Sequence, residues 1–165
     1  PVGSGLGGGS CDAVFALKAY NELFSLGLDQ DKLLQYASRL GSDCSFFVYN
    51  RPMFGTGRGD VLEPYDIDLS GYDIKVLVPE RIRVSTAEAY EGVTLHEGMP
   101  LREALSHPVE DWKDVLVNDF EKTIFEKYPR LAKIKQDFYD RGAVYASMTG
   151  SGSAIFGLFK KVDKD

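Results

Sequence analysis

The chain has 165 residues, of which 44% are hydrophobic and 27% are charged, so it can bury a core and is not expected to be disordered. Asp and Glu outnumber Lys and Arg by 25 to 19, and the net charge of −6 argues against a broad nucleic-acid-binding surface, although not against a local anion site. No apolar run approaches the roughly 20 residues of a membrane-spanning helix, and two cysteines are too few for a disulfide scaffold. These features predict a soluble cytoplasmic protein that binds neither nucleic acid nor a membrane.

The chain begins with a glycine-rich segment, which two predicted helices follow. Five glycines lie among the first ten residues, and apolar residues at helical spacing follow over residues 13–24. Ser10 is predicted to cap this first helix, and Gly27 is predicted to end it. A second helix is predicted between Asp29, as its N-terminal cap, and Gly41, as its stop.

Strand signals follow the two helices. The apolar, aromatic run at residues 46–49 favours a buried strand, and the glycines at residues 55–59 indicate a hairpin or a tight loop. The character of the sequence then changes near residues 66–71. We therefore predict one domain over residues 1–68 and another over residues 69–165.

The second half predicts a small α+β arrangement with a glycine loop of its own. Ser85 is expected to cap a short helix, and two apolar stripes at helical spacing run over residues 117–128 and 131–138. Strands are predicted at residues 74–79, 143–148 and 154–159. Residues 149–153 form the loop between the last two strands. The charged faces of the helices over residues 113–140 are expected to face solvent.

The N-terminal glycine loop admits several interpretations. Residues 3–8 satisfy the G-x-G-x-x-G pattern of dinucleotide-binding folds, but that pattern requires a β-α-β unit, and here two helices follow. A Walker loop requires a Gly-Lys pair, which the chain lacks. A loop that leads directly into a helix binds phosphate through main-chain N–H groups and the helix dipole, without a lysine. A flexible linker is the remaining alternative.

Three segments resemble, in the same order, the motifs of one enzyme family, the GHMP kinases (galactokinase, homoserine, mevalonate and phosphomevalonate kinases). Residues 1–13 resemble the second motif of the family, a glycine-rich loop. Residues 41–47 resemble the motif around its catalytic aspartate, and residues 148–154 are similar to its C-terminal glycine loop. Three motifs at family-like spacing are more specific than any one of them, and the resemblance covers essentially the whole chain.

The resemblance implies an α+β GHMP kinase fold. Residues 1–68 would be the later part of an ATP-binding N-terminal domain like ribosomal protein S5, and residues 69–165 would form a ferredoxin-like C-terminal domain. Chains of this family start well before the glycine loop, so we expect a longer enzyme, of which these residues alone have little kinase activity. Sheet edges left unpaired by such a truncation favour self-association.

The resemblance also implies ATP-dependent phosphorylation of an alcohol. The triple glycine followed by Ser is the form used by members that phosphorylate the 2-hydroxyl of 4-diphosphocytidyl-2-C-methyl-D-erythritol, in non-mevalonate isoprenoid synthesis. Asp43 matches the catalytic aspartate, which would accept or orient the hydroxyl proton. Ser10 would reach Mg²⁺ or a phosphate oxygen. The residues that would surround the ATP phosphates are Gly3, Gly5, Leu6, Gly7, Gly8, Gly9, Ser10, Gly150, Ser151, Gly152 and Ser153.

Other functions stay open from the sequence. One is a GHMP kinase that acts on mevalonate or homoserine, and another is a non-catalytic nucleotide-binding or interaction module with the same fold. Asp43 also suits a turn or a helix end, and residues 150–153 also suit a plain β-turn. His96 and His107 lack a second ligand at metal spacing, so they are expected to be surface residues and no protein metal site is predicted.

Overall fold

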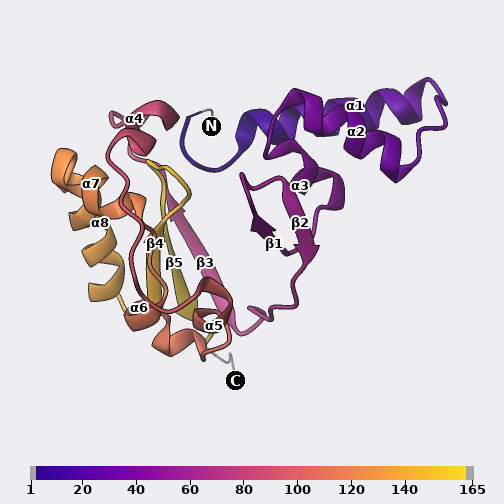
Figure 1. Ribbon diagram of the computed structural model, residues 1–165. Coiled ribbons are helices and arrows are strands. Elements are labelled where there is room, and N and C mark those ends of the chain that lie inside the picture. Colours follow the sequence, from indigo (N-terminus) through magenta and orange to yellow (C-terminus); the bar gives the residue numbers. More distant parts are fainter. Residues whose placement is uncertain (1–2, 163–165) are drawn as a thin grey trace. The chain divides into compact units, whose positions relative to one another are not determined.

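The computed structural model describes residues 3–162, which form two compact units (Figure 1). One unit comprises Gly7–Asp68, and the other comprises Gly3–Leu6 together with the chain from Leu69 onward. The architecture is α+β, as the sequence predicts, with helices and two small antiparallel sheets. Within residues 3–162, no helix combines the length and the apolar character that are needed to cross a membrane.

Three helices and a hairpin make up the first unit. Its elements are α1 (Gly8–Leu23), α2 (Gln30–Leu40), α3 (Cys44–Tyr49), β1 (Met53–Thr56) and β2 (Val61–Pro64). β1 and β2 form the predicted hairpin. The predicted limits of α2 are confirmed, because Asp29 Oδ1 accepts a hydrogen bond from the Lys32 N–H at 2.9 Å and Gly41 caps the C-terminus. The buried core of this unit consists of Val14, Ala37, Cys44 and Val48.

Both predicted limits of α1 are wrong. Gly7 caps the N-terminus in the left-handed region (φ +66°), so Ser10 lies inside the first turn and does not cap it. The helix also ends before Gly27. The reason is local, because the side chain of Asn21 donates to the Leu28 carbonyl at 3.0 Å and accepts from the Leu28 N–H at 2.9 Å, which holds the chain in a turn.

The strand predicted at residues 46–49 is wrong as well, because these residues belong to α3. A short apolar run is compatible with either a buried strand or a helix. Cys44 and Val48, which lie four residues apart, are both buried, and this spacing is helical. Lys18 Nζ of α1 donates to the carbonyls of Phe47 and Val48 at 2.8 and 3.0 Å, so it satisfies acceptors that the end of the helix leaves open.

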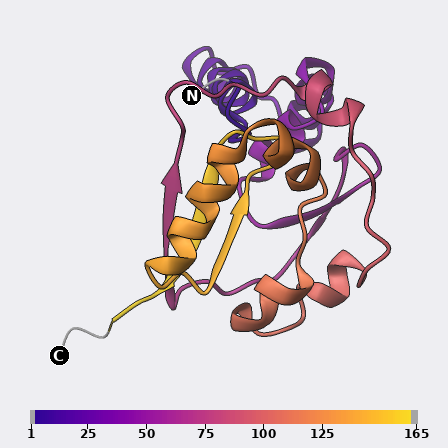
Figure 2. The same ribbon diagram turned by 90° about the vertical axis from the view of Figure 1, so that its left-hand side faces the viewer.

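An antiparallel sheet with the strand order β3-β5-β4 forms the centre of the second unit. The three strands are β3 (Tyr72–Leu77), β4 (Tyr145–Met148) and β5 (Ile155–Lys160), and each overlaps a predicted strand. α7 (Phe120–Lys127) precedes α8 (Pro129–Asp140), and α8 lies across β4 and β5 (Figure 2). The core between helices and sheet contains Ile124, Leu131, Phe138, Ala146, Met148 and Ile155.

Short elements connect β3 to α7. They are α4 (Thr86–Glu91), α5 (Leu101–Ala104), the 3-10 helix η1 (Val109–Asp111) and α6 (Trp112–Val115). Ser85 caps α4 as predicted, since its Oγ accepts from the Glu88 N–H at 3.1 Å. Trp112 packs edge-on against Tyr145, with ring centroids 5.6 Å apart, and burial raises the pKa of Tyr145 to about 12.

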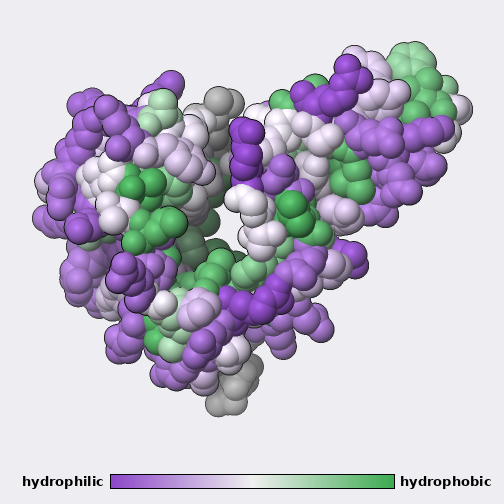
Figure 3. Space-filling model, viewed as in Figure 1, coloured by the Kyte–Doolittle hydropathy of each residue, from purple (hydrophilic) through white to green (hydrophobic). Residues whose placement is uncertain are grey.

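Apolar side chains stay exposed at several places, two of which are the end of α1 and the strand β3. Leu23 and Phe24 are 75% and 60% exposed, and the end of α1 forms the hydrophobic patch at the upper right of Figure 3. On β3, which is an edge strand of the second unit's sheet, Ile74 and Val76 are 56% and 49% exposed. Such surfaces are compatible with the self-association expected from the sequence, which stays a prediction.

Replacing Leu131 by Ala is expected to lower the free energy of unfolding of the second unit by about 2–5 kcal/mol, because this side chain is fully buried and a cavity would remain. Trp112, the single tryptophan of the chain, is buried in the same unit, so its fluorescence in a urea titration reports this unfolding. Leu95→Ala is the matched control, since Leu95 is 77% exposed and its loss should change the free energy by less than about 0.5 kcal/mol. Equal effects of the two substitutions would contradict this packing.

Candidate functional site

The two predicted glycine loops meet within the second unit. The Ala154 N–H donates to the Ser4 carbonyl at 2.9 Å, and Thr149 Oγ1 donates to the Gly5 carbonyl at 2.7 Å. Gly5 has φ +77°, and a Cβ at this position would lie 2.1 Å from the Thr149 carbonyl oxygen. Only glycine permits so close an approach of two main chains. These contacts place Gly3–Leu6 in the second unit, although the sequence analysis assigned it to the first domain.

The second glycine loop is a tight connection between β4 and β5. The Gly152 N–H donates to the Thr149 carbonyl at 2.9 Å, and the Thr149 N–H donates to the Ala154 carbonyl at 2.9 Å. The N–H groups of Gly150 and Ser151 have no acceptor among residues 3–162. Gly150 is exposed and Ser151 is half-buried. Two main-chain donors of this loop are therefore available to a ligand.

Two serines of the predicted site lie in different surroundings. Ser153 is 1% exposed, and its Oγ donates to the Ile82 carbonyl at 2.6 Å, so its hydroxyl is used inside the protein. Ser10 is half-buried in the first turn of α1, and its hydroxyl does not cap the helix. Ser10 can therefore offer its hydroxyl to a ligand, whereas Ser153 can offer only its main chain.

The N-terminus of α1 lies in the first unit and has no side-chain cap. Gly7 lies beside α3, where a Cβ would come within 2.9 Å of Phe47 Cζ. A Cβ at Gly9 would meet no atom within 4 Å, and no acidic residue lies in the first turn. The first N–H groups of a helix lack helical partners and carry the positive end of its dipole. This end of α1 therefore has the chemistry of an anion site.

Asp43 occupies the N-cap position of α3 in the same unit, makes no side-chain capping hydrogen bond and is exposed. Ser42 Oγ donates to Asp43 Oδ1 at 3.3 Å, and the carboxylate makes no ion pair with any side chain of residues 3–162. Helix α3 also carries Phe47, the neighbour of Gly7. The structure thus places Asp43 and the start of α1 in the first unit, and the paired glycine loops in the second.

Asn118 and Glu121, which the sequence analysis did not single out, hold the second glycine loop. Asn118 Nδ2 donates to the carbonyls of Met148 and Gly150 at 2.8 and 2.9 Å. Glu121 is 9% exposed and accepts from the Met148 N–H at 2.7 Å, so the expectation that charged helix faces over residues 113–140 all meet solvent is wrong. One signal was available in the sequence, because Asn118 lies at the start of the helical pattern over residues 117–128, where a capping residue is expected.

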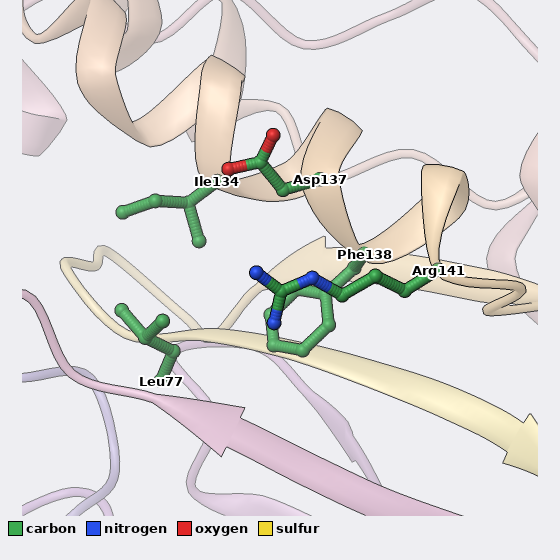
Figure 4. A pocket seen from close by; sticks show the side chains of 5 residues that line it. All are labelled: Leu77, Ile134, Asp137, Phe138 and Arg141. Atoms are coloured by element: carbon green, nitrogen blue, oxygen red, sulfur yellow. The ribbon is translucent and has the colours of Figure 1, made fainter.

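Several cavities of different size lie in the second unit. One has a volume of about 40 Å³ and is lined by Leu77, Ile134, Asp137, Phe138 and Arg141. Figure 4 shows the Arg141 side chain reaching back over Phe138. This cavity is far below the roughly 300–1,000 Å³ of typical ligand pockets. Another, of about 400 Å³, is lined in part by Asn118 and Glu121, the two residues that contact the second glycine loop and the strand before it.

The two histidines make ordinary contacts. His96 Nδ1 lies 2.7 Å from Asp119 Oδ1, and the His107 carbonyl accepts from Trp112 Nε1 at 2.9 Å. In the part of the chain that the structure describes, no group of three or more His, Cys, Asp or Glu side chains could hold a metal ion.

Gly5→Ala is expected to lower the free energy of unfolding of the second unit by roughly 1–3 kcal/mol, because a side chain there is strained and overlaps Thr149. The readout is again Trp112 fluorescence in urea. Gly71→Ala is the matched control in the same unit, since a Cβ at Gly71 would meet no atom within 4 Å and its φ lies outside the left-handed region. A Gly5→Ala protein as stable as the control would show that the two loops do not touch.

Two family models and several curated relatives match this chain. Residues 1–51 match the GHMP kinases N terminal domain, and residues 101–165 match the GHMP kinases C terminal family. The 4-diphosphocytidyl-2-C-methyl-D-erythritol kinase of Bacteroides fragilis is 47% identical over 165 residues, which cover 99% of this chain and 60% of that protein. The enzyme of the same name from Thermodesulfovibrio yellowstonii is 39% identical over 172 residues, which cover 96% of this chain and 59% of that protein.

A solved structure supports the same relationship. The crystal structure of a 4-(cytidine 5'-diphospho)-2C-methyl-D-erythritol kinase superposes with a TM-score of 0.80 at 30% identity, and the match covers 96% of this chain and 58% of that one. The chain thus spans about three fifths of the length of the relatives that it matches. Its fold is the GHMP kinase fold. The glycine loops, the fold and these relatives lead to one conclusion: the chain belongs to the GHMP kinase family.

Proposed function

We propose that the protein carrying this chain is an ATP-dependent kinase that phosphorylates the 2-hydroxyl of 4-diphosphocytidyl-2-C-methyl-D-erythritol. The observation that carries the proposal is that relatives of this name match 96–99% of the chain, a span that includes both glycine loops and Asp43. In this assignment residues 1–68 belong to an ATP-binding domain like ribosomal protein S5. Residues 69–165 then belong to the ferredoxin-like C-terminal domain of the family.

Main-chain N–H groups supply the proposed site for the ATP phosphates. The uncapped first turn of α1 offers N–H donors at the positive end of the helix dipole. The second loop offers the N–H groups of Gly150 and Ser151. Only Leu6 and Gly7 separate Gly5, which contacts the second loop, from α1 in the sequence. We assign to phosphate binding Gly3, Gly5, Leu6, Gly7, Gly8, Gly9, Ser10, Gly150, Ser151, Gly152 and Ser153.

Asp43 is proposed to accept the proton of the substrate hydroxyl. In phosphoryl transfer the hydroxyl oxygen bonds to the γ-phosphorus, the bond from that phosphorus to the bridging oxygen breaks, and ADP leaves. The hydroxyl proton must pass to a base within hydrogen-bond reach. Asp43 is exposed and makes no ion pair within residues 3–162, so its carboxylate is available for this proton. Beyond this proton acceptor, phosphoryl transfer needs mainly positioning and charge stabilisation, so the protein supplies little covalent chemistry.

The donor atoms of the proposed site also fit Mg²⁺. This ion prefers oxygen ligands and is commonly held by one or two carboxylates together with substrate phosphates and water. Ser10 offers a hydroxyl oxygen, whereas residues 3–162 contain no group of three or more metal-binding side chains. Such a donor set suits an ion that arrives with the nucleotide. When bound, Mg²⁺ would neutralise the charge of the triphosphate.

Asp43→Asn is expected to lower kcat by about 10²–10⁴-fold, because the amide cannot accept the hydroxyl proton. The KM for ATP should change little, since the phosphate donors are main-chain groups. A coupled assay of ADP release, on the protein expressed from its complete reading frame, measures both constants. Asp31→Asn, at an exposed residue of α2, is the matched control and should retain full activity.

The choice of substrate separates the competing functions. Turnover of 4-diphosphocytidyl-2-C-methyl-D-erythritol alone, lost in Asp43→Asn, supports the proposal. Turnover of mevalonate or homoserine instead would identify another branch of the family. Activity on no alcohol would refute the kinase assignment and favour a nucleotide-binding module.

A further inference from the structure

The strand β4 lies at an edge of its sheet, and side chains satisfy the main chain along that edge. Tyr139 Oη donates to the Ala146 carbonyl at 3.2 Å and accepts from the Ala146 N–H at 3.1 Å. Burial raises the pKa of Tyr139, so its hydroxyl stays protonated and can serve in both roles. Two residues further along β4, Glu121 accepts from the Met148 N–H and Asn118 donates to the Met148 carbonyl. Helices α7 and α8 thus replace a neighbouring strand up to the start of the glycine loop.

Asn118 reaches past the end of the strand into the loop. Its Nδ2 bridges the carbonyls of Met148 and Gly150, which lie on either side of Thr149. Its Oδ1 accepts from the Phe120 N–H at 3.0 Å in the first turn of α7. A reversed amide would bring its oxygen against two carbonyl oxygens, so the contacts define one orientation. The loop is therefore tied to the N-terminus of α7.

Glu121, in the first turn of α7, supports the same point. Its Oε1 accepts from the Met148 N–H at 2.7 Å and from Ser147 Oγ at 3.1 Å, while its Oε2 lies 2.5 Å from Lys135 Nζ of α8. A buried carboxylate is costly unless it is paired and hydrogen-bonded, and here both conditions are met. The Glu121 N–H also donates to the Asn118 carbonyl at 2.9 Å, so the two side chains share one rigid turn.

From these contacts we propose that Asn118 and Glu121 are positioning residues that hold the second glycine loop in the conformation that receives the ATP phosphates. The inference rests on the proposed kinase function. A loop that is already ordered loses less conformational freedom when it binds, and its N–H dipoles need not reorient as charge develops. Neither residue touches the phosphates in this scheme, because Asn118 acts through the carbonyls of Met148 and Gly150 and Glu121 acts through the N–H of Met148.

The test replaces the donor of Asn118. Asn118→Asp keeps the shape of the side chain but places an oxygen against two carbonyls, and Asn118→Ala removes the donor without adding charge. Asn50→Asp makes the same chemical change at an exposed residue that ends α3 in the first unit. Trp112 fluorescence confirms that each variant is folded before it is assayed.

Two measurements are compared among these variants. In the protein from the complete reading frame, both Asn118 variants should raise the KM for ATP by about tenfold or more, with the KM for the alcohol substrate unchanged. Amide hydrogen exchange of Gly152, whose N–H donates to Thr149 within the loop, should become about tenfold faster without any ligand. Asn50→Asp should change neither value. A merely structural role would instead lower the amount of active protein and leave both KM values as they are.

The outcomes separate this inference from the proposed function. A wild-type protein that phosphorylates no alcohol refutes the kinase assignment, and the exchange rate of Gly152 still decides whether Asn118 holds the loop. An active wild type with an unchanged KM for ATP in both Asn118 variants overturns the positioning role. An unchanged exchange rate at Gly152 overturns it as well, whatever the activity.

Discussion

The contact between Gly5 and Thr149 joins segments that lie 144 residues apart in the sequence, and the proposed chemistry of the second unit depends on it. A Cβ at Gly5 would lie 2.1 Å from the Thr149 carbonyl oxygen, so the two loops come together with only main chain between them. A ligand at such a place meets N–H groups more readily than side chains. Main-chain dipoles stabilise an anion best when they are already oriented, so the surrounding structure must hold the loops in place.

The sheet of the second unit provides this support along its edge strand β4. Edge strands present unpaired N–H and C=O groups, which invite pairing with another chain. Along β4 these groups are instead bonded to Tyr139, Glu121 and Asn118 from neighbouring helical segments. The same contacts protect the edge and orient the loop that follows it. Stability and the proposed positioning of the loop thus depend on one set of hydrogen bonds in this unit.

The first unit contributes features of a different kind. The start of α1 has main-chain donors and no side-chain cap, and Asp43 at the start of α3 has an exposed carboxylate. Packing of Phe47 beside Gly7 keeps these two helices together. The core behind them is small, with Val14, Ala37, Cys44 and Val48 as its buried residues. In a GHMP kinase such a pairing of a positive helix end and a carboxylate suits a phosphate donor and a hydroxyl acceptor.

Interactions between residues that are close in the chain account for the features that the sequence by itself determined. The cap at Asp29, the hairpin of β1 and β2, the strands of the second sheet and the glycine motifs all follow from residues that are near one another in the chain. The tertiary structure alone decided the helical state of α3, because an apolar run fits a strand or a helix until its partners are known. It also decided the burial of Glu121, whose acceptor role depends on Met148, 27 residues away. A charged residue in a helical pattern predicts a solvated face, and only a distant main-chain donor and a paired lysine reverse that expectation.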